Sequence, residues 1–292
     1  MIKFSNVSKR FRRNQVLKEI DLSILRGQRV ALVGSNGAGK TTLIRCLLGE
    51  YNCSGQITVD ELNPREFRQQ VLSKVGFVPQ LPPPLRMPVG QLIHFAASLC
   101  GAEAELMQHV AALLGFDAVQ FKHQPFVKLS GGQKQKLLIA IALGRDSELL
   151  VMDEPAANLD PDARHTLFKL LAEKQNSSAM LISSHRLDEV ASLVNRVVEM
   201  DQGRIVLDDV VADLVDMSSQ LACQISMLQY EPAFAKALGE WGFSSSSVNT
   251  VWTGIIAGPD RLLFLGMLSR YAALLSGIAM DEVVQSRKEH VA

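Results

Sequence analysis

A glycine-rich loop between two apolar segments places the strongest constraint on the fold of this 292-residue chain. Residues 29–33 (RVALV) form a continuous apolar run, which is typical of a strand buried on both faces. The loop that follows, residues 34–42 (GSNGAGKTT), precedes a helical pattern of apolar residues at 43, 44, 47 and 48. This order of strand, loop and helix predicts an α/β fold with the loop at the carboxyl edge of a parallel sheet.

The loop matches the pattern G-x-x-x-x-G-K-T, in which each residue type has a chemical role. Glycines allow successive backbone N–H groups to converge on phosphate oxygens, and the helix N-terminus adds partial positive charge. We expect Lys40 to reach the β- and γ-phosphates of a nucleotide and Thr41 to ligate Mg²⁺. The alternative is an ordinary glycine turn before a helix. The predicted phosphate-binding residues are Gly34, Ser35, Asn36, Gly37, Ala38, Gly39, Lys40, Thr41 and Thr42.

A second apolar segment, residues 149–152 (LLVM), ends in the carboxylates Asp153 and Glu154. Ligands of α/β folds bind at the edge where the strands end. Asp153 therefore suits the coordination shell of Mg²⁺, and Glu154 suits the polarisation of a water that attacks the γ-phosphate. A solvated acid at a strand end is the ordinary interpretation of such a segment by itself. Together with the phosphate-binding loop, it indicates a site that hydrolyses a nucleotide.

The pattern of elements predicts two domains. Strands and helices alternate over about the first 200 residues, starting with strands near residues 2–4 and 16–25, with a helical region over 89–120 and a hairpin over 197–207. The character changes near residues 217–219. We expect residues 1–215 to form the first domain, and residues 216–292 to form a small α+β domain with strands at 223–228, 248–257 and 278–284. Its predicted helices cover 232–241 and 259–275, and the serine run 244–247 is predicted to be a loop.

Composition excludes several classes of protein. The 30 basic and 30 acidic residues cancel, whereas a dedicated nucleic-acid binder usually carries a basic excess, so we expect no nucleic-acid partner. The four cysteines form no C-x-x-C pair, which favours a reducing compartment. Residues 262–280 come nearest to a membrane span, but Arg270 lies at their centre. We therefore expect that the chain does not cross a membrane by itself.

A third motif, residues 129–133 (LSGGQ), reveals a family resemblance. Ser130 is suited to cap a helix, and that local role is expected in any case. With this motif between the loop and Asp153, residues 1–215 resemble the ATP-binding subunits of ABC transporters, whose signature is LSGGQ. Further matches are Gln80 in VGFVPQ, Asp160 in NLD, His185 in ISSHRLDEV, and Phe11 where the family more often has a tyrosine.

The resemblance implies a P-loop NTPase fold of the ABC cassette type, with a mixed sheet core, an antiparallel β subdomain and a helical subdomain at about residues 88–135. It implies that ATP and Mg²⁺ are bound, and that Glu154, His185 and Gln80 are catalytic, with Gln80 also near the metal. Phe11 would stack on adenine, although the alternative is a core phenylalanine. Two copies of the chain would form a homodimer in which the signature of one contacts the ATP of the other, through Ser130, Gly131, Gly132, Gln133 and Asp160.

The resemblance further implies a multi-span membrane permease as partner, so we expect a cytoplasmic protein that is peripheral on the inner face of the membrane. A cassette with a small tail resembles subunits of ABC-2-type exporters, including those that mature nitrous oxide reductase. An alternative is a soluble ABC ATPase that acts on ribosomes or DNA, but those types carry two cassettes, long coiled coils or zinc modules. A P-loop kinase is disfavoured by the signature and by Glu154. For the small C-terminal domain, three roles stay open: a regulatory module, a dimer-stabilising module or a cap over the edge of the cassette.

Overall fold

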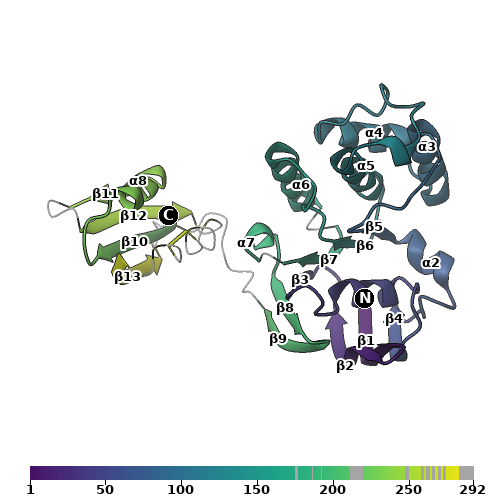
Figure 1. The fold of residues 1–292 in the computed structure, drawn as a ribbon, viewed down its shortest axis with the longest axis horizontal. Helices are drawn as coiled ribbons and strands as arrows, with labels where there is room; N and C mark the ends of the chain where they lie inside the picture. The colour runs from purple at the N-terminus through teal and green to yellow at the C-terminus, as the bar shows by residue number, and fades with distance from the viewer. Residues whose placement is uncertain are drawn as a thin grey trace, which may run out of the picture. The chain divides into compact units, whose positions relative to one another are not determined.

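The chain forms two compact units, Met1–Val211 and Ala212–Ala292, in the computed structural model (Figure 1). The predicted boundary between residues 215 and 216 lies outside the described residues. The structure describes residues 1–174, 177–185, 187–191, 193–210, 220–246, 250–257, 260, 264, 267–268, 271 and 274–282.

A six-stranded sheet forms the centre of the first unit, in the order β5-β6-β7-β3-β8-β9. The first five strands in this order are parallel, and β9 runs antiparallel to β8, which confirms the predicted hairpin. The buried apolar runs of β3 and β6 occupy the middle of this sheet, as their composition predicts. The strands are β3 (Arg29–Val33), β5 (Val75–Val78), β6 (Leu149–Asp153), β7 (Ala179–Ser184), β8 (Arg196–Asp201) and β9 (Arg204–Val210).

A second, antiparallel sheet has the strand order β2-β1-β4, with β1 at Ile2–Phe11, β2 at Asn14–Ile24 and β4 at Ser54–Val59. Its apolar residues join one face of the central sheet and helix α1 (Lys40–Leu47) in a single buried cluster. The combination of a mixed central sheet and an antiparallel subdomain confirms the predicted fold class.

A group of helices, α3 (Val89–Cys100), α4 (Ala104–Leu113) and α5 (Gly131–Leu143), gathers at one side of the first unit (Figure 1). The helical region predicted over 89–120 contains two helices and ends at Leu113, and Gly101 separates the two by ending α3 with a left-handed φ of 61°. Gly115, with a φ of 75°, follows α4 in the same way. The remaining helices are α2 (Arg68–Ser73), a short 3-10 turn (Phe126–Lys128), α6 (Pro161–Glu173) and α7 (Leu187–Val190).

The second unit is a four-stranded antiparallel sheet with one described helix, α8 (Pro232–Glu240), as the α+β prediction requires. Ser244–Ser245 form strand β11 rather than part of a loop, because the buried Phe243 packs closely against Gly254 of β12 and anchors this segment to it. Most of the helix predicted over 259–275 lies outside the described residues. The other strands are β10 (Gln220–Met227), β12 (Val251–Ala257) and β13 (Leu275–Glu282). Within the described part of the chain, no helix is both long and apolar enough to span a bilayer.

Candidate nucleotide-binding site

The glycine-rich loop connects β3 to α1 through backbone conformations that favour glycine. Gly34, Gly37 and Gly39 all have positive φ angles, of 143°, 86° and 109°. At Gly34 a side chain is also excluded by space, because a Cβ atom would lie 2.2 Å from the carbonyl oxygen of Met200 on β8. The glycines thus bring the loop against the sheet and turn it into the first turn of α1, where backbone N–H groups have no helical partner.

Lys40 is the first residue of α1 and is almost fully buried. Its Nζ atom donates hydrogen bonds to the carbonyl oxygens of Gly34, at 2.5 Å, and of Ser35, at 3.2 Å. The same atom lies 3.9 Å from Oε1 of Glu154. The ammonium group is therefore held inside the loop, where it adds its charge to the partial positive charge at the start of α1.

The two carboxylates at the end of β6 are both buried, and Ser183 of the neighbouring strand β7 positions them. The Ser183 hydroxyl donates a 2.6 Å hydrogen bond to Oδ1 of Asp153 and accepts one of 3.0 Å from the backbone N–H of Glu154. Glu154 has a φ of 51°, a left-handed conformation that is uncommon for a residue with a side chain. Such strain persists only where neighbouring contacts enforce it, and it concentrates at functional sites.

His185 follows β7 directly, and its Nδ1 atom lies 2.6 Å from Oε2 of Glu154. An ionised carboxylate only accepts hydrogen bonds, so with Glu154 ionised the donor of this pair is Nδ1 of His185. The histidine side chain is 52% exposed, whereas that of Glu154 is 8% exposed. One oxygen of Glu154 thus faces the lysine of the loop and the other faces a histidine that is open to solvent.

Thr41 and Asp153 suit a Mg²⁺ ion by the chemistry of their oxygen atoms. Thr41 lies in the first turn of α1, and α1 packs against β6, which ends at Asp153. No group of three or more His, Cys, Asp or Glu side chains able to hold a metal occurs in the described part of the chain. A hydroxyl and one carboxylate match Mg²⁺ in nucleotide sites, because that ion keeps several waters and takes the remaining oxygens from phosphates.

Gln80 and Phe11 lie on two other elements. Gln80 is half-buried and comes two residues after β5, which pairs in parallel with β6, so it lies at the same sheet edge as Asp153. Phe11 ends β1 and is 40% exposed, so it is not a core residue. The edge of its ring meets Tyr51, with 5.2 Å between ring centroids, and Nζ of Lys9 lies 4.7 Å from its centroid.

The signature residues lie at the start of α5, which begins at Gly131. The helix therefore starts six residues before the apolar part of its sequence, which begins at residue 137. Ser130 caps the helix in a capping box, in which its hydroxyl accepts from the Gln133 N–H at 3.2 Å and the Gln133 side chain accepts from the Ser130 N–H at 2.9 Å. Ser130 and Gly131 are exposed. A Cβ atom built on Gly131 meets no described atom within 4 Å, so packing does not require this glycine.

Asp160 joins the signature residues rather than the phosphate-binding loop. It caps α6 by accepting a 2.9 Å hydrogen bond from the Ala163 N–H, and its Oδ2 lies 2.7 Å from Nζ of Lys136 on α5. The hydrogen bond from Lys136 lowers the pKa of the Asp160 carboxyl. Ser130, Gly132, Gln133 and Asp160 line one cavity of about 290 Å³. The predicted residues therefore form two groups, one around the loop and one around the signature, except for Phe11, whose ring contacts among the described residues are with Tyr51 and Lys9.

Three positioning residues were missed by sequence reasoning: Ser183, Lys136 and the fully buried Gln135, whose amide donates to the carbonyl of Pro155 at 3.2 Å. Only Ser183 had a signal, since it lies two residues before His185 at the end of the apolar run 179–182. The partners of Lys136 and Gln135 become visible only when α5 is placed beside the segment that follows β6.

Comparisons with known proteins support one family. The family model described as ABC transporter matches residues 17–157. The Nod factor export ATP-binding protein I of Cupriavidus pinatubonensis is 34% identical over 231 residues, which cover 77% of this chain and 70% of that protein. The glutamine transport ATP-binding protein GlnQ of Escherichia coli is 34% identical over 71% of this chain and 90% of its own length. A solved ATP-binding subunit of an ABC transporter has a TM-score of 0.66 and 26% identity, over 73% of this chain and 91% of that one.

Proposed function

The chain belongs to the ABC transporter family as an ATP-binding protein with ATPase activity, and from this premise we propose that two copies of it hydrolyse ATP between them to energise a membrane transporter. The observation that carries the proposal is the position of Glu154, between Lys40 of the phosphate-binding loop and the exposed His185.

The loop group binds the nucleotide. Backbone N–H groups of residues 34–42 and the ammonium of Lys40 hold the phosphates, since both concentrate positive charge at the start of α1. The ring of Phe11 stacks on adenine, and its exposure at the end of β1 leaves it accessible to a base. Thr41 and Asp153 hold Mg²⁺ with Gln80 nearby, and when bound this ion neutralises charge on the phosphate oxygens.

Glu154 acts on the attacking water. Its carboxylate accepts a proton from the water as that water attacks the γ-phosphate, and the strained backbone held by Ser183 fixes its direction. His185 donates to one carboxylate oxygen and so leaves the other oriented toward the site of attack. Lys40 moves from the loop carbonyls to the phosphates when these provide better acceptors.

The signature group completes the site of a second copy. Ser130 and Gly131 are exposed at the N-terminus of the thirteen-residue helix α5, where backbone N–H groups favour an anion. The open space at Gly131 allows the backbone itself to approach a γ-phosphate. Asp160 lies beside these residues and links the two nucleotide sites across the dimer interface.

The partner is a multi-span membrane permease, and the chain is a cytoplasmic subunit on the inner face of the membrane. The names of its relatives support a transport role, since one refers to Nod factor export and another to glutamine transport. Because such different cargoes occur with similar cassettes, we propose that the permease selects the cargo and that this chain supplies the energy.

The dependence of ATPase rate on protein concentration tests the shared site. If the active unit is a dimer, the rate per chain should rise with concentration at low concentrations and then level off. A rate per chain that stays constant, while sedimentation shows a monomer over the same range, would contradict the proposal.

A further inference from the structure

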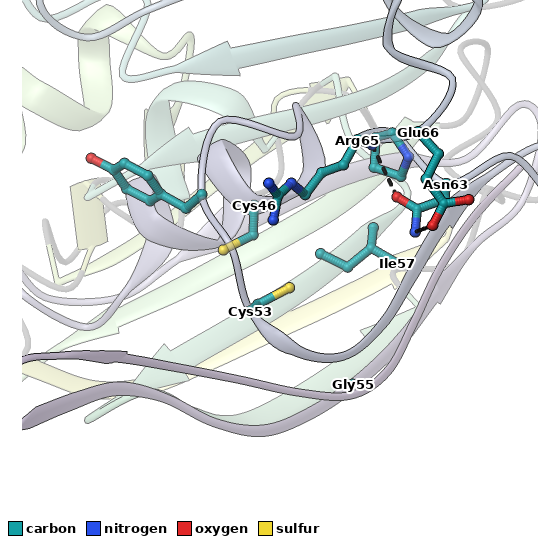
Figure 2. Close-up of a pocket in the computed structure, with 9 residues that line it drawn as sticks. Cys46, Cys53, Gly55, Ile57, Asn63, Arg65 and Glu66 are labelled. Carbon is teal, nitrogen blue, oxygen red and sulfur yellow. Dashed lines mark hydrogen bonds between the residues drawn. The ribbon is translucent and has the colours of Figure 1, made fainter.

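A cavity of about 340 Å³ lies where the end of α1 meets the antiparallel sheet, outside the residues assigned to nucleotide. Cys46 enters it from the last turn of α1, and Cys53 enters it from the segment just before β4. Figure 2 shows the two side chains in this cavity, with the Arg65 side chain extending toward Cys46. Both thiols are free.

The two thiols have different environments. Cys46 is 1% exposed, whereas Cys53 is half-buried and accessible from the cavity. The neighbouring Cys46 thiol and, after it, the charges of Lys9 and Arg65 lower the pKa of Cys53 to about 7. The interaction with Cys53 and burial raise the pKa of Cys46. Cys53 is thus partly ionised and accessible at neutral pH, whereas Cys46 is buried and stays protonated.

The charges around Cys53 favour an anionic reagent. Lys9 donates a 2.5 Å hydrogen bond to the carbonyl of Asn52, which holds its ammonium beside Cys53, and Arg65 lines the cavity. Glu66 also lines the cavity, and its carboxylate accepts a hydrogen bond from Asn63 at 3.1 Å.

We propose that Cys46 and Cys53 form a reactive dithiol site that a small anionic disulfide, such as oxidised glutathione, converts into an internal disulfide. The thiolate of Cys53 attacks one sulfur of the reagent, which forms a mixed disulfide and releases one thiol. Cys46 then loses its proton and attacks the sulfur of Cys53, which releases the second thiol. In the balanced reaction, the two cysteines are oxidised by two electrons and the reagent is reduced to two thiols.

The arrangement of the pair supports the second step. Cys46 and Cys53 line the same cavity and are neighbours in Figure 2, so closure to the disulfide S–S distance of about 2.05 Å joins adjacent side chains. Cys53 lies directly before β4, and Cys46 lies in the last turn of α1, so the disulfide would join the end of the helix to the start of this strand. Neither step involves nucleotide, so the proposal does not depend on the assigned ATP site.

The test treats the full-length reduced protein with oxidised glutathione and follows intact mass and peptide maps. The wild type should lose two hydrogens and retain no glutathione at Cys46 or Cys53. Cys46→Ser, and Cys46→Ala as a variant that keeps the buried position apolar, should instead hold one glutathione on Cys53. Cys53→Ser should leave Cys46 unreacted, and Cys100→Ser should form the same internal disulfide as the wild type.

The rate of the first step should increase about tenfold per pH unit below pH 7 and level off above it, because it follows the thiolate of Cys53. A mixed disulfide that persists at Cys53 in the wild type would overturn the proposal. An unreacted Cys53 under conditions in which Cys100 is modified would overturn it equally.

Discussion

At the scale of single residues, Ser183 connects the two acids at the end of β6. Its hydroxyl donates to Asp153 and accepts from the N–H of Glu154, and the serine is fully buried. Without the hydroxyl, the buried Asp153 carboxylate loses a hydrogen-bond donor at a cost of about 1–3 kcal/mol. We therefore expect Ser183→Ala to lower the free energy of unfolding by about that amount and to slow ATP turnover.

Urea unfolding and a steady-state ATPase assay measure the two effects of Ser183→Ala. Ser177→Ala is a matched control. Ser177 is exposed, and among the described contacts its hydroxyl donates only to the carbonyl of Lys174, which caps the C-terminal end of α6. It should change stability by less than about 0.5 kcal/mol. Equal stability of wild type and Ser183→Ala would show that the serine does not support the site.

At the scale of elements, the start of α5 contains a glycine, Gly131, that we expect to matter for turnover and not for folding. Gly131 has open space around its Cβ position, and alanine is the better helix former. Gly131→Ala should therefore fold at least as stably as the wild type and bind a fluorescent ATP analogue with unchanged affinity. Because a methyl group would block the close approach of this backbone to the γ-phosphate of the partner, turnover should fall by tenfold or more.

Gly239→Ala provides the control for Gly131→Ala. Gly239 lies in α8, is exposed and has equally open space among the described residues. This variant should keep full ATPase activity. If Gly131→Ala also kept full activity, the signature would not contact nucleotide in the way proposed.

Elements next to the motifs were the most predictable part of the molecule. Lys40, Asp153 and His185 each follow or end a short apolar strand, so their place at one sheet edge follows from the parallel order of those strands. The break between α3 and α4 and the start of α5 were less predictable. They depend on the left-handed conformation of Gly101 and on the capping box of Ser130, which outweigh the apolar periodicity.

Contacts between elements could not be predicted from this sequence. The ion pair of Lys136 with Asp160 and the bond of Gln135 to Pro155 depend on how α5 packs beside the segment after β6. The left-handed backbone of Glu154 likewise results from contacts with β7, and glutamate has no local preference for it. These tertiary contacts orient the site, whereas the motifs supply its chemistry.

At the scale of the whole molecule, each unit has its own buried core. The described clusters of the first unit extend to Met200 and to Ile205 of β9, and the cluster of the second unit is built around Phe234, Leu238 and Phe264. A chain shortened after Val211 should therefore unfold cooperatively and bind the ATP analogue within twofold of the full-length affinity. Circular dichroism during heating and a nucleotide titration measure both, and loss of cooperative unfolding would show that the units depend on each other.

The ATP-dependent association of Glu154→Gln tests the central claim most directly. If Glu154 accepts the proton of the attacking water, glutamine should keep ATP affinity and reduce turnover by at least about 100-fold. Sedimentation should then show a dimer with ATP and a monomer with ADP, whereas Glu173→Gln, at the exposed end of α6, should behave as the wild type. A Glu154→Gln protein that hydrolyses ATP at the wild-type rate, or that stays monomeric when saturated with ATP, would contradict the account.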